Sequence, residues 1–142
     1  VQRILDIYRD CAQELLAIRD AFLSRLVYQT YNGYVVSQFK KLRQRLKNGL
    51  EPKRKHAMHL VRLLRAGIVI LREARVPVDV GAARDELLAI RDGSMDWPQV
   101  DALRGSLHAE FDEAYRATAL PDRPDYAAID AWLVRARRSM VR

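Results

Sequence analysis

The spacing of the apolar residues restricts the fold of this chain more than any other feature of its sequence. Along most of the chain, apolar side chains recur every three or four residues, which places them on one face of an α-helix. Residues 3–27 follow this rhythm with Ile4, Leu5, Ile7, Tyr8, Cys11, Leu15, Ile18, Phe22 and Leu26. We therefore expect an all-α protein, with about six helices packed as an irregular bundle.

Capping residues and helix breakers divide the first half of this pattern into three helices. The first is predicted over residues 3–27, and the second begins near Thr30, a good N-cap residue, and ends at Asn48-Gly49. The third begins near Pro52 and runs to about Ala74. Its high density of apolar residues predicts a central, mostly buried helix.

The second half contains three shorter helical patterns separated by clear breaks. The segment VPVDVG predicts a loop or one short extended edge strand near residues 76–80, because proline and β-branched valines disfavour a helix. A short helix then ends at Gly93, and Asp96 caps the next one, with Pro98 in its first turn. Residues 120–124, LPDRP, end that helix before the last one, YAAIDAWLVRARRSM.

Length and composition exclude several classes of protein. A chain of 142 residues fits one domain, so we expect residues 1–142 to form a single helical domain. The one cysteine, Cys11, excludes a disulfide within the chain and has no neighbours that would activate a thiol. No apolar run approaches the length of about 18 to 20 residues that crosses a bilayer, so we expect a cytoplasmic protein without membrane contact. The chain begins at Val rather than Met, so we expect it to be part of a longer protein.

The positive charge of the chain is concentrated in its first half. Residues 1–75 contain 16 Lys and Arg against 6 Asp and Glu, a net of +10, whereas residues 76–142 contain 9 against 12, a net of −3. Residues 40–55 alone hold eight basic side chains and one acid, Glu51. Such a field attracts phosphate groups, although a solvated helical face would look the same in the sequence.

Catalytic and metal sites have little support. His56 and His59 are three residues apart on one helix, but no Cys, Asp or Glu nearby supplies the further ligands that a zinc site needs. Asp112 and Glu113 are adjacent, so on a helix they point about 100° apart and cannot act together on one bond. We therefore expect no catalytic residue and no metal ligand within this chain.

Two polar stripes remain as candidates for ligand binding. On the second helix the stripe comprises Tyr31, Tyr34, Gln38 and Lys41, with Ser37 on its flank, and on the third helix it comprises Lys55, His59 and Arg62. Aromatic rings that stack on a base, amides that bond to it and cations for phosphates are the components of a nucleotide or single-strand site. Gly33 would let a backbone or ligand approach closely. The alternative is that both tyrosines are packing residues at the start of a helix.

Three blocks of the sequence, taken in order, resemble a known family. YQTYNGYVVSQFKKL (28–42), KRKHAMHLVRLLRAGIVIL (53–71) and DELLAIRDG (85–93) are similar to the C-terminal helical region of bacterial predicted nucleotidyltransferases of the DNA polymerase β superfamily. The resemblance covers about residues 22–138. Members pair a helical domain with an α/β catalytic domain, whose signature is a Gly-Ser followed by paired Asp residues that hold two Mg²⁺ ions. This chain lacks that signature, so the resemblance implies that an N-terminal catalytic half is missing and that the chain is not active alone.

The resemblance also assigns roles to the stripes. It implies that Ser37, Lys41 and Tyr34 contact a nucleoside triphosphate, and that Lys53, Lys55, His56, His59 and Arg62 bind phosphates of the nucleotide or of a nucleic-acid acceptor. The triphosphate and Mg²⁺ would be ligands of the full-length enzyme. Two alternatives stay open on the sequence alone: a stand-alone helical module that binds nucleic acid, and a structural domain whose basic face contacts an acidic protein.

Overall fold

The computed structural model describes residues 2–141, and within them the fold is all-α, as predicted. Six α-helices and two short 3₁₀-helices follow one another, and no strand occurs in this range, so residues 76–80 form a loop. The helices divide into two compact units, residues 1–24 with 121–142 and residues 25–120. No helix among these residues is long and apolar enough to cross a membrane.

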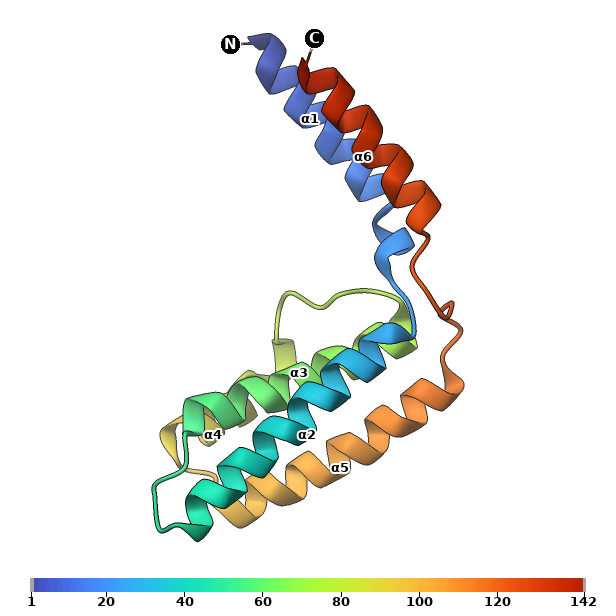
Figure 1. Cartoon of the computed structure of the whole chain (residues 1–142). Coiled ribbons are helices and arrows are strands. Elements are labelled where there is room, and N and C mark those ends of the chain that lie inside the picture. The colour runs from blue at the N-terminus through green and yellow to red at the C-terminus, as the bar shows by residue number, and fades with distance from the viewer. Residues whose placement is uncertain (1, 142) are drawn as a thin grey trace. The chain divides into compact units, whose positions relative to one another are not determined.

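The larger unit, residues 25–120, is built around one central helix (Figure 1). α3 (Arg54–Glu73) packs against α2 (Leu26–Lys47), α4 (Arg84–Asp92) and α5 (Trp97–Ala117), and η2 (Gly81–Ala83) precedes α4. Its buried side chains form the largest share of the core, which confirms the sequence prediction: Ala57, Leu60, Val61, Leu64, Ile68, Ile70 and Leu71. Val35 and Phe39 of α2 and Phe111 of α5 belong to the same core, together with further buried residues of α2, α4 and α5.

The smaller unit pairs the two ends of the chain. α1 (Gln2–Ala17), η1 (Arg19–Phe22) and α6 (Tyr126–Val141) belong to it, and α1 and α6 lie side by side (Figure 1). Across the pair, the indole Nε1 of Trp132 donates to the backbone oxygen of Cys11 at 3.3 Å, and Arg135 lies 3.5 Å from Glu14. The Cys11 thiol lies 3.7 Å from the hydroxyl of Ser139. Apolar burial is slight, since α1 has no buried residue and Ala136 is the one buried residue of α6.

Several helix ends confirm the sequence signals. Asn48 ends α2 and Gly49 adopts a left-handed φ of 72°, while Gly93 follows α4 with a φ of 91°. α5 begins with a complete capping box, because Asp96 accepts from the backbone of Gln99 and the Gln99 side chain accepts from the backbone of Asp96. These ends depend on short-range geometry, which is why the sequence predicted them.

The boundary between the first two helices was predicted wrongly. α1 ends at Ala17 instead of continuing to residue 27, and α2 begins at Leu26 rather than near Thr30. Thr30 therefore lies inside α2, where its hydroxyl donates to the backbone oxygen of Leu26 at 3.1 Å instead of capping a helix. As a result Tyr31, Gly33 and Tyr34 lie in the body of α2 and not at its head.

Candidate functional site

Side chains of α2 and α3 meet on one polar face of the larger unit. Gln38 and Lys41 project from α2, and Lys53, His56 and His59 come from the start of α3. The two helices are joined here by a hydrogen bond of 3.2 Å between His56 Nε2 and Gln38 Oε1. Since an amide oxygen can only accept, His56 donates from Nε2. We call these five residues the basic face.

Positive charges lie close together on the basic face, and they affect the pKa of His56. Burial lowers the pKa of His56 below its usual value of 6.5, and the nearby charges of His59, Lys53 and Lys41 lower it further. His56 is therefore neutral near pH 7, and Lys41 and Lys53 lie exposed around it. An anion bound here would relieve the repulsion among these cations.

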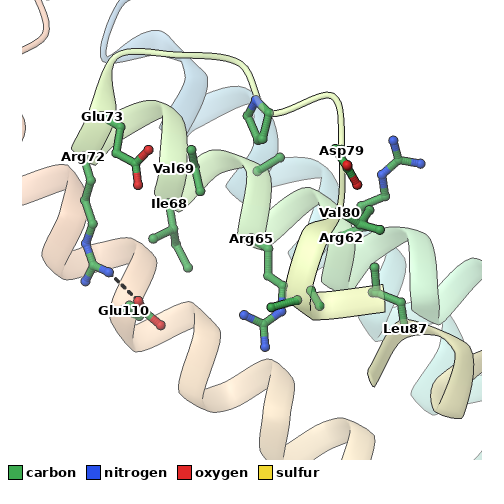
Figure 2. Close-up of a pocket in the computed structure, with 14 residues that line it drawn as sticks. Arg62, Arg65, Ile68, Val69, Arg72, Glu73, Asp79, Val80, Leu87 and Glu110 are labelled. Atoms are coloured by element: carbon green, nitrogen blue, oxygen red, sulfur yellow. Dashed lines mark hydrogen bonds and ion pairs between the residues drawn. The ribbon is translucent and has the colours of Figure 1, made fainter. Parts of the chain in front are cut away.

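The remaining predicted residues lie in different surroundings. The ring of Tyr34 is 49% exposed on α2, and the hydroxyl of Ser37 is used locally, donating to the backbone oxygen of Tyr34 at 3.0 Å. Lys55 is exposed on α3. Arg62, two helical turns further on, lines a separate cavity (Figure 2).

Tyr31 packs inward rather than outward. Its side chain is half-buried against the core, and its ring approaches Gly67 so closely that a Cβ there would lie 3.1 Å from Tyr31 Cδ2. Of the α2 stripe, Gln38 and Lys41 therefore belong to the basic face, Tyr34 is free to contact a ligand, and Tyr31 helps to pack α2 on α3.

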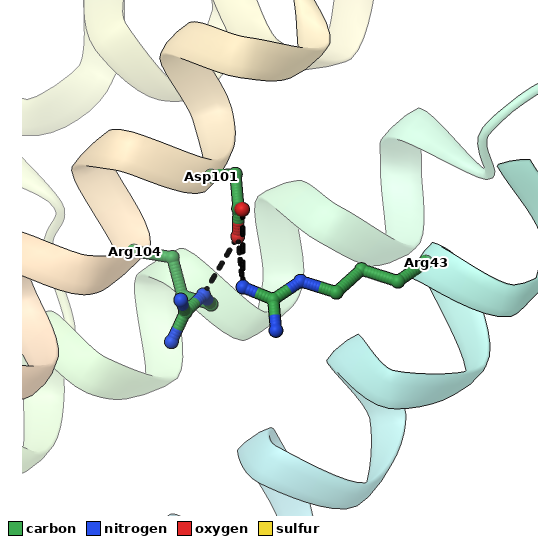
Figure 3. A network of polar contacts seen from close by, with 3 residues as sticks. All are labelled: Arg43, Asp101 and Arg104. Atoms are coloured by element: carbon green, nitrogen blue, oxygen red, sulfur yellow. Dashed lines mark hydrogen bonds and ion pairs between the residues drawn. The ribbon is translucent and has the colours of Figure 1, made fainter. Parts of the chain in front are cut away.

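Part of the positive run at residues 40–55 is engaged within the fold. Arg43 donates to both carboxylate oxygens of Asp101, at 2.7 and 3.0 Å, and Arg104 donates to the same carboxylate at 3.0 Å (Figure 3). Burial alone would raise the pKa of Asp101, but the hydrogen bonds and charges of the two arginines lower it.

Two further arginines of the run bind backbone oxygens, Arg45 that of Glu51 at 2.6 Å and Arg54 that of Met95 at 3.0 Å. These side chains tie elements together, whereas Lys40, Lys41, Lys47, Lys53 and Lys55 are all exposed. The lysines are therefore the cations of this run whose ammonium groups can donate to a ligand.

Comparison with known families agrees with the resemblance seen in the sequence. The sequence model of the RNA repair pathway DNA polymerase beta family (RlaP) matches residues 7–135, which include all of the larger unit and most of α1 and α6. The chain belongs to the RlaP family. No curated protein and no solved structure matches it.

This RlaP chain also contains a polar cluster that sequence reasoning missed, on another face of α2. Tyr28 donates to Asp112 of α5 at 2.6 Å, and His108 Nε2 lies 2.5 Å from the side-chain oxygen of Asn32. The hydrogen bond to Asp112, together with burial, raises the pKa of Tyr28 to about 12, and burial lowers the pKa of His108.

The signal for this cluster is present but ambiguous in the sequence. Tyr28 and Asn32 are four residues apart, as are His108 and Asp112, so each pair shares a helix face. The spacing within each helix does not predict that these faces of α2 and α5 contact each other. The stacking of Tyr28 on Tyr115, with ring centroids 4.1 Å apart, identifies the cluster as part of the α2–α5 packing.

Acidic and metal-ligating groups are dispersed in this RlaP chain. Among residues 2–141, no group of three or more His, Cys, Asp or Glu side chains could hold a metal ion. The Mg²⁺ ions implied by the resemblance therefore find no ligand set in these residues. The side chains of the basic face have the charge and the hydrogen-bond donors that an anion needs.

Proposed function

We propose that this chain is the nucleotide- and acceptor-binding helical part of a nucleotidyltransferase, which transfers a nucleoside monophosphate from a nucleoside triphosphate to an acceptor. Membership of the DNA polymerase beta-like family supports the reaction class, and the family's description as an RNA repair pathway supports RNA as the acceptor. The carboxylates and Mg²⁺ that catalyse such a transfer would come from an α/β catalytic domain outside these residues.

The observation that carries this proposal is the convergence of cations from two helices on the basic face. Lys41 of α2 lies close enough to His56 of α3 to lower its pKa, as do Lys53 and His59. The cations of the basic face repel one another. A triphosphate bound against them would attract them and accept charge-assisted hydrogen bonds from them. The exposed ring of Tyr34, one turn before Gln38, offers a surface on which a base stacks.

Binding of a phosphate at this face should also favour the charged form of His56. Because an anion stabilises imidazolium, the bound state takes up a proton that the free state lacks near neutral pH. Affinity for a triphosphate should therefore rise as the pH falls from about 7.5 to about 6. Calorimetry in two buffers of different ionisation enthalpy would measure that proton uptake.

The matched pair Lys41→Ala and Lys40→Ala tests the site. Both residues are exposed lysines of α2, but they are adjacent, so their side chains point about 100° apart. We expect Lys41→Ala to weaken binding of a nucleoside triphosphate to this chain by about tenfold, the usual cost of one charge-assisted hydrogen bond, and Lys40→Ala to change it by less than about twofold. Equal affinities for both variants and the wild type would remove the assignment.

A second candidate function is binding of single-stranded nucleic acid without nucleotidyl transfer, and the exposed lysines at the α2–α3 turn favour it. Lys47 lies at the end of α2, and Lys53 and Lys55 lie at the start of α3. If these residues bind a strand, log affinity should fall with log salt by about 0.7 for each phosphate neutralised. A steep salt dependence with no affinity for free triphosphates would favour this function over transfer.

A further inference from the structure

A cavity on another part of α3 has chemistry that the basic face does not explain. It has a volume of about 290 Å³ and lies between α3, the loop at residues 76–80, η2 and the first turn of α4, with Glu110 of α5 at one side (Figure 2). Ile68, Val69, Val80 and Leu87 give it an apolar lining. This size is at the lower end of the range for pockets that bind small molecules.

Charged side chains surround this apolar lining, and nearly all of them already have partners. Arg65 donates from Nε and a terminal nitrogen to the two carboxylate oxygens of Glu86, each at 2.8 Å, and Arg72 forms an ion pair with Glu110. Glu73 pairs with Arg75 at 2.6 Å.

The last acid of the lining, Asp79, accepts from the backbone nitrogen of Gly81 at 2.9 Å. Each acidic group around the cavity is thus engaged by a donor from the protein. The glutamates are paired with arginines, whereas the donor to Asp79 is a neutral backbone amide.

Arg62 is the exception among the charged groups of the lining. It is exposed on α3, and no hydrogen bond or ion pair joins it to another residue between 2 and 141. In Figure 2 its side chain lies at the same end of the cavity as Asp79, away from Arg72 and Glu110. Its exposed guanidinium can therefore donate to a ligand in the neighbouring apolar pocket.

We propose that this cavity binds a small organic carboxylate, with its apolar body against Ile68, Val69 and Leu87 and its carboxylate on Arg62. A planar guanidinium matches a carboxylate in geometry as well as charge. The negative charge of Asp79 at the same end disfavours a ligand with two negative charges, which selects a monoanion over a phosphate monoester. This site goes beyond the proposed nucleotide function, and its test needs no nucleotide.

Three related probes test the chemistry of the ligand on the unmodified chain. They are 4-tert-butylbenzoate, its neutral amide 4-tert-butylbenzamide, and 4-tert-butylphenyl phosphate, each titrated while backbone amide chemical shifts are recorded. We expect the benzoate to shift amides of residues 62–69 and 79–87, and to bind about tenfold more tightly than the amide. A benzamide that binds as tightly as the benzoate, or a phosphate that binds more tightly, would overturn the proposal.

Two variants and a control variant test whether the benzoate binds in this cavity. Arg62→Ala should weaken benzoate binding by about tenfold, whereas Arg91→Ala, which removes an exposed arginine of α4 outside the cavity, should leave it within about twofold. Ala66→Leu should abolish binding by filling the cavity from α3, where leucine is a good helix former. Unchanged benzoate affinity in Ala66→Leu, with the amide spectrum of the rest of the unit preserved, would show that the ligand binds elsewhere.

Discussion

Two glycines illustrate how single residues in this chain are constrained by packing. Gly33 lies exposed on α2, and a Cβ added there would meet nothing within 4 Å. Gly67 of α3 is buried, and a Cβ there would lie 2.6 Å from Cε2 and 2.9 Å from Cζ of Phe111. The contact between α3 and α5 therefore requires glycine at position 67 but not at position 33, whose suggested role in ligand approach stays a prediction.

Alanine substitutions at these positions should change stability in opposite directions. Gly67→Ala forces Phe111 or Tyr31 to move, and overpacking of this kind costs about 1 to 3 kcal/mol. Gly33→Ala should raise the free energy of unfolding by up to about 1 kcal/mol, because alanine has the higher helix propensity. Urea unfolding followed by circular dichroism would measure both, and a Gly67→Ala variant as stable as the wild type would contradict the close contact.

The hydrogen bond from Tyr28 to Asp112 predicts a stability change at alkaline pH. The folded-state pKa of Tyr28 is raised to about 12 from 10.0, so the folded protein holds a phenolic proton that the unfolded chain has lost between these values. The contribution of this hydrogen bond is thus fully present below pH 10 and is lost as the pH rises through 12. Tyr28→Phe lacks the titrating group, so the difference in unfolding free energy between wild type and Tyr28→Phe should shrink over that interval. A constant difference would argue against the raised pKa.

Among the elements, α5 shows how a local sequence signal becomes measurable stability. Asp96 accepts from the backbone nitrogen of Gln99 at 2.9 Å, and the side-chain oxygen of Gln99 accepts from the backbone nitrogen of Asp96 at 2.9 Å. Asp96→Ala should lower the free energy of unfolding by about 1 kcal/mol, whereas Asp96→Asn, which keeps a capping oxygen, should cost less. Thermal unfolding of the two variants would compare them, and equal losses would indicate that the charge of Asp96 rather than its cap is what stabilises α5.

The start of α2 shows what sequence patterns cannot supply. Its N-cap position holds Arg25, which has no side-chain capping bond, so the usual signal is missing and Thr30 offered a false one. Arg25 instead donates to the backbone oxygen of Tyr115 at 3.2 Å and lies 4.8 Å over the Tyr115 ring. The helix start is thus associated with contacts to α5, 90 residues away in the chain. Helix periodicity alone carries no information about such a contact.

The same limit applies to the candidate site. The stripe of Tyr34, Gln38 and Lys41 follows from the helical period, and so does the spacing of His56 and His59. That Gln38 meets His56, and that Tyr31 turns inward to Gly67, depends on how α2 packs on α3. Partners on different helices are set by packing, so the sequence predicted candidate residues but not which of them lie together.

At the scale of the whole molecule, the two units differ in how much apolar surface they bury. Within the larger unit, Leu60, Val61 and Leu64 of α3 are at most 1% exposed. Within the smaller unit, Ile4, Leu5 and Leu16 of α1 are more than half exposed, at 59%, 52% and 61%. A pair of helices that buries so little has a small free energy of local opening.

This contrast predicts unequal protection from hydrogen exchange along the chain. Backbone amides at the centre of α3 open only with the core, so they should exchange at least about tenfold more slowly than amides at the centre of α1, after correction for intrinsic rates. Mass spectrometry of peptic fragments from the intact chain would measure both helices in one experiment. Leu60→Ala provides the matched control, because removing a buried leucine should accelerate exchange in α3 and leave α1 unchanged. Equal protection in the wild type would mean that α1 opens as rarely as the core, which its exposed side chains do not account for.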